Sequence, residues 1–250
     1  MEHFVTYFKS ILIPFVGIWT LIFQIPEPIY PLSLFLQFFS FIYVRDALLP
    51  AGLWTIRAEL ETGVFEMKFI EDIYALSALC VLCIFNAGLM YYTNKVVLPL
   101  KSMRIELLRN CAVGVGFSLL IYYPVYLYRQ LSPMVVLSNL QNNPPLSAAV
   151  LGICLCGNLV EEVLYRGFLA RYLKSYGVSM LRSIFIQASM FAVLHMYLAF
   201  IVTDVGVPVL VFTFYEGLIC AYLENRYGLA ASTVAHGLAI FYFCMFTYSF

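Results

Sequence analysis

Long apolar runs, separated by short polar connections, dominate the chain. A run of about 20 residues is long enough to cross a bilayer as an α-helix, and runs near this length recur from residue 8 onward. The predicted spans are Phe8–Ile25, Tyr30–Val44, Ile73–Thr93, Cys111–Tyr128, Ser147–Lys174, Met180–Thr203, Val205–Leu223 and Leu229–Phe250. Because the second run is short for a crossing, the pattern predicts seven to eight transmembrane helices in an all-α, polytopic membrane protein.

Two longer polar stretches interrupt this series of spans. Residues 45–72 carry three basic and six acidic side chains, which predicts a solvated connection with an amphipathic helix around Trp54–Phe69. The stretch Arg129–Pro145 ends in an Asn-Asn-Pro-Pro run, which is typical of a loop. We therefore expect N-terminal spans in residues 1–145 and a four-helix core in residues 146–250, within one membrane domain.

Composition strengthens the membrane prediction. Hydrophobic residues make up 63% and charged residues 11% of the 250 residues, whereas soluble domains average about 45–50% and about 25%. The formal net charge is zero, which gives no electrostatic reason to expect a nucleic-acid partner. The seven cysteines fall almost entirely in apolar runs, and we interpret them as small packing residues rather than a disulfide framework.

Lysine and arginine positions predict how the spans are oriented. The basic residues crowd three connections that lie two spans apart: Lys95, Lys101, Arg104 and Arg109, then Arg171, Lys174 and Arg182, then Arg226. The connections between them hold Arg129 alone or no basic residue. Because basic loops stay on the cytoplasmic side, these three connections are predicted to face the cytoplasm.

Glu161 and Glu162 are unusual in this pattern, since they lie side by side inside an apolar span. Each acid at membrane depth costs about 2.5–3.5 kcal/mol on insertion scales. In a helix, Glu162 and Arg166 lie on one face with the acid N-terminal, which is the favourable arrangement for an ion pair. Glu161 is rotated about 100° away and has no basic residue at helical spacing, so we predict a separate role for it. The alternative is that both acids serve helix packing.

Two histidines in other spans reach a similar depth. Counted at about 1.5 Å per residue from the predicted cytoplasmic ends, Glu161 lies about 13 Å deep, His236 about 10 Å and His195 roughly 15–20 Å. A single intramembrane histidine is commonly a packing group, but three ionisable side chains are costly to bury separately. The sequence therefore predicts that the three meet in one site in the cytoplasmic half of the bilayer.

These residue types suit the hydrolysis of an amide without a covalent intermediate. A buried glutamate can act as a general base on water. One histidine can orient that water, and the other can donate a hydrogen bond to the developing oxyanion. The same donor atoms also suit zinc, but the helical His-Glu-x-x-His arrangement that indicates a zinc site is absent from the sequence. We therefore expect no cofactor and assign no metal ligand.

The C-terminal spans carry motifs that resemble those of a known family. In chain order they are Glu161-Glu162-x-x-x-Arg166, Phe191-x-x-x-His195, and His236 preceded by Gly217, Tyr222, Arg226 and Gly228. In their order and depth they resemble the motifs of the CPBP family, which comprises the CAAX proteases and bacteriocin-processing enzymes. This family is also called the ABI family and includes the Rce1-type prenyl-protein endopeptidases. The resemblance covers about Leu146–Phe243, and residues 1–145 share only their apolar spans.

The resemblance implies a glutamate-dependent intramembrane endopeptidase. By position, Glu161 would activate a water molecule with His195 as its partner, and His236 would stabilise the oxyanion. The supporting residues would be Glu162 and Arg166, which hold the site by their ion pair, and Phe191, which packs one turn from His195.

One position departs from the family pattern. The last motif commonly reads His-x-x-x-Asn, and Ile240 stands where the Asn would lie. Isoleucine cannot donate a hydrogen bond, and loss of one oxyanion donor typically costs about 10²–10³ in rate. Glu216, an acid inside the seventh span, is a candidate replacement because a neutral carboxyl donates; alternatively it makes a packing contact or lines a water-filled cleft. For the nearby donors Tyr165 and Tyr215 we expect core packing.

The expected partner is a membrane-embedded or lipid-anchored protein or peptide within the lipid bilayer. The sequence does not choose between a prenylated CAAX substrate and a substrate of a prokaryotic member, and we expect a prokaryotic cell membrane as the location. Two other functions stay open. A weak or inactive family member acting as a membrane scaffold or immunity protein is suggested by Ile240. A small proton-coupled transporter would also use intramembrane Glu and His, although the absence of an inverted repeat disfavours it.

Overall fold

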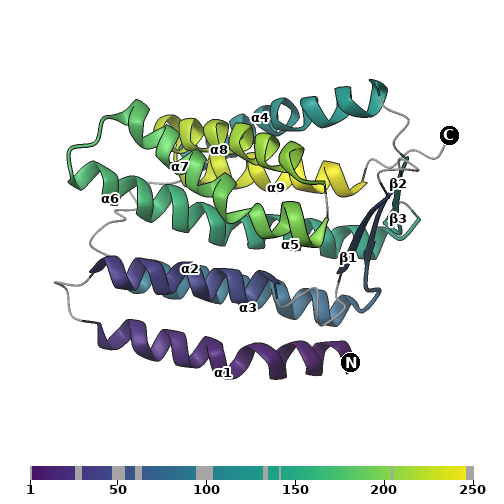
Figure 1. The fold of residues 1–250 in the computed structure, drawn as a ribbon, viewed down its shortest axis with the longest axis horizontal. Helices are drawn as coiled ribbons and strands as arrows, with labels where there is room; N and C mark the ends of the chain where they lie inside the picture. The colour runs from purple at the N-terminus through teal and green to yellow at the C-terminus, as the bar shows by residue number, and fades with distance from the viewer. Residues whose placement is uncertain are drawn as a thin grey trace.

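The computed structural model describes residues 2–25, 30–46, 54–59, 64–93, 104–131, 135–140, 142–203 and 205–245. Its helices run back and forth along one long axis, and a small sheet lies at one end of the bundle (Figure 1). The helices are α1 (Glu2–Gln24), α2 (Tyr30–Asp46), α3 (Ile73–Thr93), α4 (Arg104–Leu131), α5 (Pro144–Glu162), α6 (Ala170–Ser175), α7 (Met180–Leu194), α8 (Val207–Tyr227) and α9 (Leu229–Met245). Two segments are π-helical, η3 (Val163–Leu169) and η4 (Leu198–Val202), and the strands are β1 (Trp54–Glu59), β2 (Val64–Phe69) and β3 (Val135–Ser138).

A helix lies at each of the eight predicted spans, as expected for an all-α polytopic membrane protein. Within the described residues, five segments are long and apolar enough to cross a membrane: Ile73–Thr93, Glu106–Tyr128, Pro144–Ser175, Met180–Ile201 and Val207–Tyr227. Two further apolar helices, Ile11–Gln24 and Leu229–Met245, are shorter. Large apolar side chains such as Ile13 and Leu108 are 80% and 76% exposed, so the outer faces suit contact with lipid rather than water.

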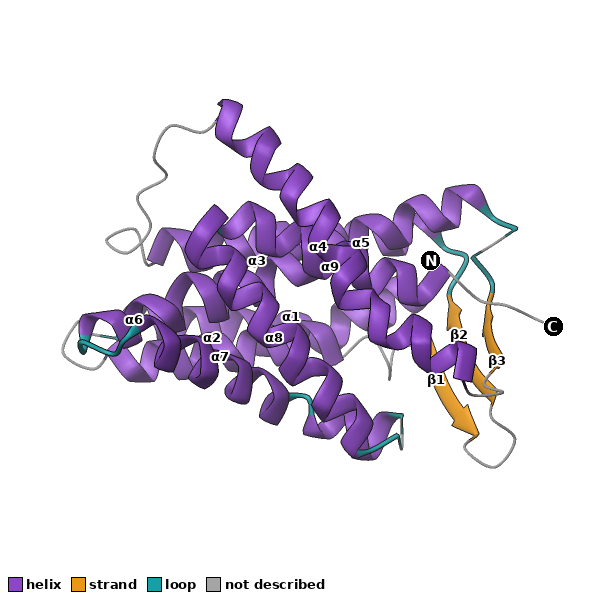
Figure 2. Ribbon diagram, turned by 90° about the horizontal axis from the view of Figure 1, so that it is seen from above, coloured by secondary structure: helices purple, strands orange, loops and turns teal. Residues whose placement is uncertain are grey.

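The amphipathic helix predicted around Trp54–Phe69 is wrong, because this stretch forms the antiparallel strands β1 and β2. Apolar and polar residues alternate along β1 and along Phe65–Phe69 of β2, and a period of two suits a strand better than a helix. In the antiparallel register the backbone of Arg57 lies opposite that of Glu66. Both views show the strands together at one end of the bundle (Figures 1 and 2).

The loop predicted at Arg129–Pro145 contains more structure than expected. Helix α4 runs to Leu131, and β3 pairs in parallel with β2. The Asn139 side chain accepts a hydrogen bond from the Phe69 backbone N–H at 3.1 Å and donates to the Phe69 carbonyl oxygen at 2.7 Å. This side chain therefore imitates a strand partner and joins the start of the C-terminal helices to β2.

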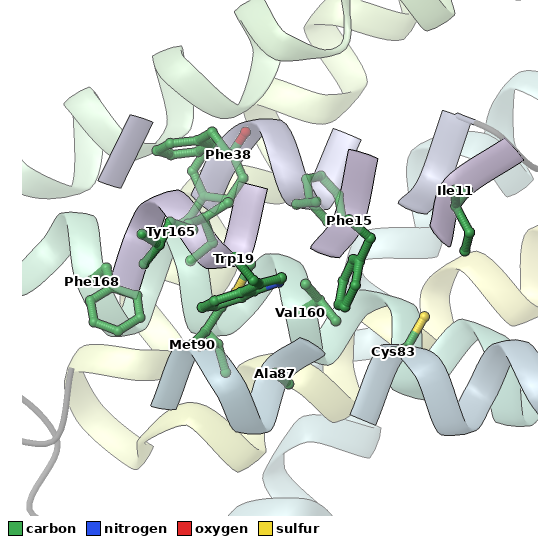
Figure 3. Close-up of a cluster of buried hydrophobic side chains, with 14 of the residues drawn as sticks. Ile11, Phe15, Trp19, Phe38, Cys83, Ala87, Met90, Val160, Tyr165 and Phe168 are labelled. Atoms are coloured by element: carbon green, nitrogen blue, oxygen red, sulfur yellow. The ribbon is translucent and has the colours of Figure 1, made fainter. Parts of the chain in front are cut away.

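The largest apolar cluster joins the N-terminal helices to the segment that follows the paired acids (Figure 3). The Asn86 side-chain oxygen accepts hydrogen bonds from Trp19 Nε1, whose ring belongs to this cluster, at 3.1 Å and from Ser40 Oγ at 3.2 Å. One buried amide thus connects α1, α2 and α3. The ring of Phe38 in α2 meets Tyr165 edge-on, with the centroids 5.2 Å apart. The N-terminal helices therefore cover one side of η3.

Candidate active site

The paired acids lie near the middle of one continuous helical segment, Pro144–Ser175, which is made of α5, η3 and α6. The π-helical segment η3 begins directly after Glu162, and every residue from 160 to 169 is buried. Turns of π-helix are rare and frequently lie at functional sites. Nothing in the residue pattern predicts η3, so its position beside the two acids is new information from the structure.

Glu162 forms the ion pair expected with Arg166. The Arg166 Nη1 atom lies 3.0 Å from Glu162 Oε1, and both side chains are fully buried. The second terminal nitrogen, Nη2, donates to the carbonyl oxygen of Gly217 in α8 at 3.4 Å. The guanidinium carbon lies 4.7 Å from the centre of the Phe191 ring in α7. Arg166 therefore neutralises Glu162 and connects η3 to two neighbouring helices.

His236 of α9 meets both adjacent acids. Its Nδ1 atom lies 2.9 Å from Glu162 Oε1, and because a carboxylate only accepts, Nδ1 must carry the hydrogen. The other ring nitrogen, Nε2, lies 3.9 Å from Glu161 Oε2 and 3.7 Å from Glu216 Oε1. None of these four side chains belongs to a residue more than 5% exposed. The structure thus gathers three acids, Glu161, Glu162 and Glu216, around the imidazole ring of His236.

His195 lies where α7 is interrupted. The helix ends at Leu194, and the His195 backbone has φ −91° and ψ 2°, a sparsely populated region in which many active-site residues are found. Its Nδ1 atom lies 2.7 Å from the carbonyl oxygen of Phe191. A carbonyl oxygen only accepts, so Nδ1 carries the hydrogen and Nε2 of the neutral ring is an acceptor. This Nε2 is suited to accept a hydrogen bond from water.

Phe191 brings the two histidines into one cluster. Its ring centroid lies 4.4 Å from that of His195 and 5.5 Å from that of His236. Tyr165 meets the same ring edge-on at 5.1 Å. The packing of Phe191 against His195, expected from their spacing, is present, and the same ring also contacts His236 and Arg166. All seven residues singled out from the sequence therefore lie in one connected, buried group.

Two glycines allow the helices of this group to approach closely. A Cβ atom on Gly217 would lie 2.9 Å from Ala188 Cα in α7, and one on Gly237 would lie 2.9 Å from Leu155 Cδ2 and 3.0 Å from the Cys154 carbonyl oxygen in α5. Each glycine follows a member of the polar cluster in sequence, Glu216 or His236. These absent side chains let α8 approach α7, and α9 approach α5, closely enough for the polar groups to meet.

Replacing Gly237 with alanine is expected to separate α9 from α5 and to move His236. Overpacking of this kind typically costs about 1–3 kcal/mol of stability, and a displacement near 1 Å in a reacting group can cost about 10²-fold in rate. We therefore expect lower thermal stability and at least about tenfold lower turnover. Gly157→Ala in α5 is the matched control, because nothing lies within 4 Å of its Cβ position. Equal effects of the two substitutions would contradict the close-packing argument.

Two residues near the site in sequence point elsewhere in space. Ile240 packs against the apolar cluster that includes Leu76, Val150 and Cys244. The Tyr215 hydroxyl donates to the carbonyl oxygen of Leu120 in α4 at 3.0 Å. Tyr215 therefore serves the contact between α8 and α4 and not the polar cluster, and Ile240 brings no hydrogen-bonding group to it.

Cys220 is a site neighbour that the sequence pattern does not single out. Among the described residues, Glu162, Cys220 and His236 bring three potential metal-ligand atoms within 4.8 Å of one another. The position of Cys220 one turn after Glu216 is the signal that could have found it. Glu162 Oε1 already faces Arg166 and the Nδ1–H of His236, so a cation there would meet the guanidinium charge. The geometry favours an ion-paired Glu162 over a metal-bound one.

Comparison with known proteins identifies this part of the chain. Residues 143–242 match the family model described as Type II CAAX prenyl endopeptidase Rce1-like. This C-terminal segment is Rce1-like. The Rce1-like segment begins at the N-cap of α5 and contains all seven residues of the connected, buried group described above. The resemblance drawn from the motifs is thereby confirmed. No curated protein and no solved structure matches the chain.

Proposed function

We propose that this protein is an intramembrane endopeptidase in which Glu161 activates water to cleave a lipid-anchored, CAAX-type peptide. The observation that carries the proposal is the approach of Glu161 Oε2 to His236 Nε2, 3.9 Å apart in a buried site of an Rce1-like segment. A carboxylate and an imidazole at this separation can both reach one reacting group that lies beside them, at ordinary hydrogen-bond distances. Both groups that hydrolysis needs, a base and a hydrogen-bond donor, are then on one side of the reacting carbon.

The proposed chemistry balances without a covalent enzyme intermediate. Glu161 takes a proton from water as the water oxygen bonds to the carbonyl carbon, and the carbonyl π electrons move onto its oxygen. His236, held as an imidazolium by its Nδ1–H bond to Glu162, donates from Nε2 to that oxyanion. His195 orients the water through its acceptor Nε2. The intermediate then collapses, the C–N bond breaks, and the proton on Glu161 passes to the leaving amine.

The surroundings of the site support a substrate that stays in the membrane. The site is buried among helices whose outer faces carry exposed apolar side chains. A substrate whose lipid chain is anchored in the bilayer would therefore be held beside these helices. The basic connections support a cytoplasmic position for the end of the bundle that carries α6. We propose that the site lies in the cytoplasmic half of a prokaryotic cell membrane.

Purified protein in liposomes is expected to cleave a peptide whose fourth residue from the C-terminus is a farnesylated cysteine. Prenylated cysteines occur in this position of C-a-a-X sequences, and the mass of the released product identifies the bond that breaks. The same peptide without the farnesyl group, which cannot anchor in the bilayer, is the matched substrate control and should be cleaved more slowly. Failure to cleave any prenylated peptide would contradict the proposed substrate class.

A non-catalytic role is the second candidate, and the environment of Ile240 favours it. The side chain at this position packs against an apolar cluster, so the proposed oxyanion site lacks the Asn donor that the resembled family commonly has four residues after the histidine. A membrane scaffold or immunity-type protein would tolerate this loss. Such a protein would retain its cellular effect after substitution of Glu161, whereas a peptidase would not.

A further inference from the structure

Glu216 lies close to Nε2 of His236, the atom that is proposed to donate a hydrogen bond to the oxyanion. Its Oε1 atom is 3.7 Å from His236 Nε2, and the residue is 1% exposed. No hydrogen bond from the described residues reaches this oxygen. A buried polar atom without a partner is costly. Its position therefore suggests that the partner arrives with the substrate.

The charges of the cluster favour an uncharged Glu216. Arg166 balances Glu162 through their ion pair, and an imidazolium at His236 balances Glu161. If Glu216 were also ionised, the buried cluster would hold three carboxylates against two cations, and an uncompensated buried charge is strongly unfavourable. A protonated carboxyl removes this excess and has an O–H to donate.

The distances also suit two donors on one oxygen. Oxyanion donors lie about 2.7–3.1 Å from the oxygen they stabilise, and two donor atoms 3.7 Å apart can both satisfy that distance. The position of Glu216 is held by its own helix, because Gly217 packs against Ala188 and accepts a hydrogen bond from Arg166. The donor that Ile240 lacks can thus come from α8 instead of α9.

We propose that protonated Glu216 is the second hydrogen-bond donor of the oxyanion site, a catalytic residue in the place that Ile240 leaves unfilled. The inference rests on the proposed peptidase function. Glu216 keeps its proton throughout and shares it with the carbonyl oxygen as negative charge develops there. The proton that is transferred moves from water to Glu161 and then to the leaving amine. A donor of this kind acts mainly in the transition state, so it affects kcat more than KM.

The test compares Glu216→Leu with Glu216→Gln in cleavage of the farnesylated peptide by protein in liposomes. Leucine removes the donor, and kcat should fall about 10²–10³-fold with little change in KM. Glutamine keeps an uncharged N–H donor, and its kcat should stay within about tenfold of wild type. Glu224→Leu, on the same helix two turns further on, is the matched control and should leave kcat essentially unchanged.

Two results would overturn this role. Equal losses in the leucine and glutamine variants would mean that the carboxyl group itself is needed, and full activity in the leucine variant would mean that no donor is needed. Glu216→Ala examines the same point if the leucine variant does not fold. These failures are distinguishable from failure of the proposed function, because the wild-type protein would still cleave the peptide and Glu161→Gln would not.

Discussion

Glu161→Gln is expected to lower kcat for the farnesylated peptide by about 10²–10⁴-fold, the range that a positioned general base contributes. Glutamine keeps the size of the side chain but cannot take a proton from water. Arg166 forms its buried ion pair with Glu162, and the substitution of Glu161 keeps both members of that pair. The melting temperature should accordingly stay close to that of the wild type, while kcat falls.

The matched control for this substitution is Glu106→Gln, the same chemical change at an exposed residue in the first turn of α4. Initial rates of product release, measured with equal amounts of folded protein, compare the two variants. The control should keep the wild-type rate. If Glu161→Gln retained more than about a tenth of the wild-type rate, Glu161 would not be the base, and the proposed mechanism would have to be abandoned.

The helices could be predicted from the sequence because apolar length alone determines where a chain crosses a bilayer. The span predicted at Ile73–Thr93 coincides with α3. The alternation along β1 and β2 was a local signal for strands that the prediction of an amphipathic helix overlooked. The pairing of β2 with β3, about 70 residues further along the chain, has no local signal. The segments η3 and η4 were missed for a related reason, since tertiary packing decides where a helix widens.

The site was predictable to the extent that it depends on spacing and depth. The Glu162–Arg166 pair follows from a separation of four residues, and the approach of His236 to the acids follows from their similar depths. Neither spacing nor depth predicts how a helix is rotated about its own axis. The contact between Glu216 and His236 depends on how α8 is turned, which the close approach of Gly217 to Ala188 helps to determine. The same kind of rotation directs Tyr215 toward α4 instead of the site.

Arg166→Met is expected to destabilise the protein by about 3–5 kcal/mol, the usual effect of removing one partner from a buried ion pair. Methionine fills part of the space but leaves the fully buried Glu162 without its guanidinium partner. It also removes the donor to the Gly217 carbonyl oxygen and the cation above the Phe191 ring. The free energy of unfolding, measured by denaturation in mixed detergent micelles, gives the size of the loss.

A double variant separates the lost charge balance from the lost packing. In Glu162→Gln/Arg166→Met both charges are absent, and glutamine can still accept the hydrogen bond from His236 Nδ1. Because replacing both members of a buried pair is far less costly than removing one, the double variant should recover most of the stability lost in the single variant. Arg182→Met, at an exposed position of α7, controls for loss of an arginine and should change stability by less than about 0.5 kcal/mol. A double variant as unstable as Arg166→Met would show that arginine packing, rather than charge pairing, holds the three helices around Glu162.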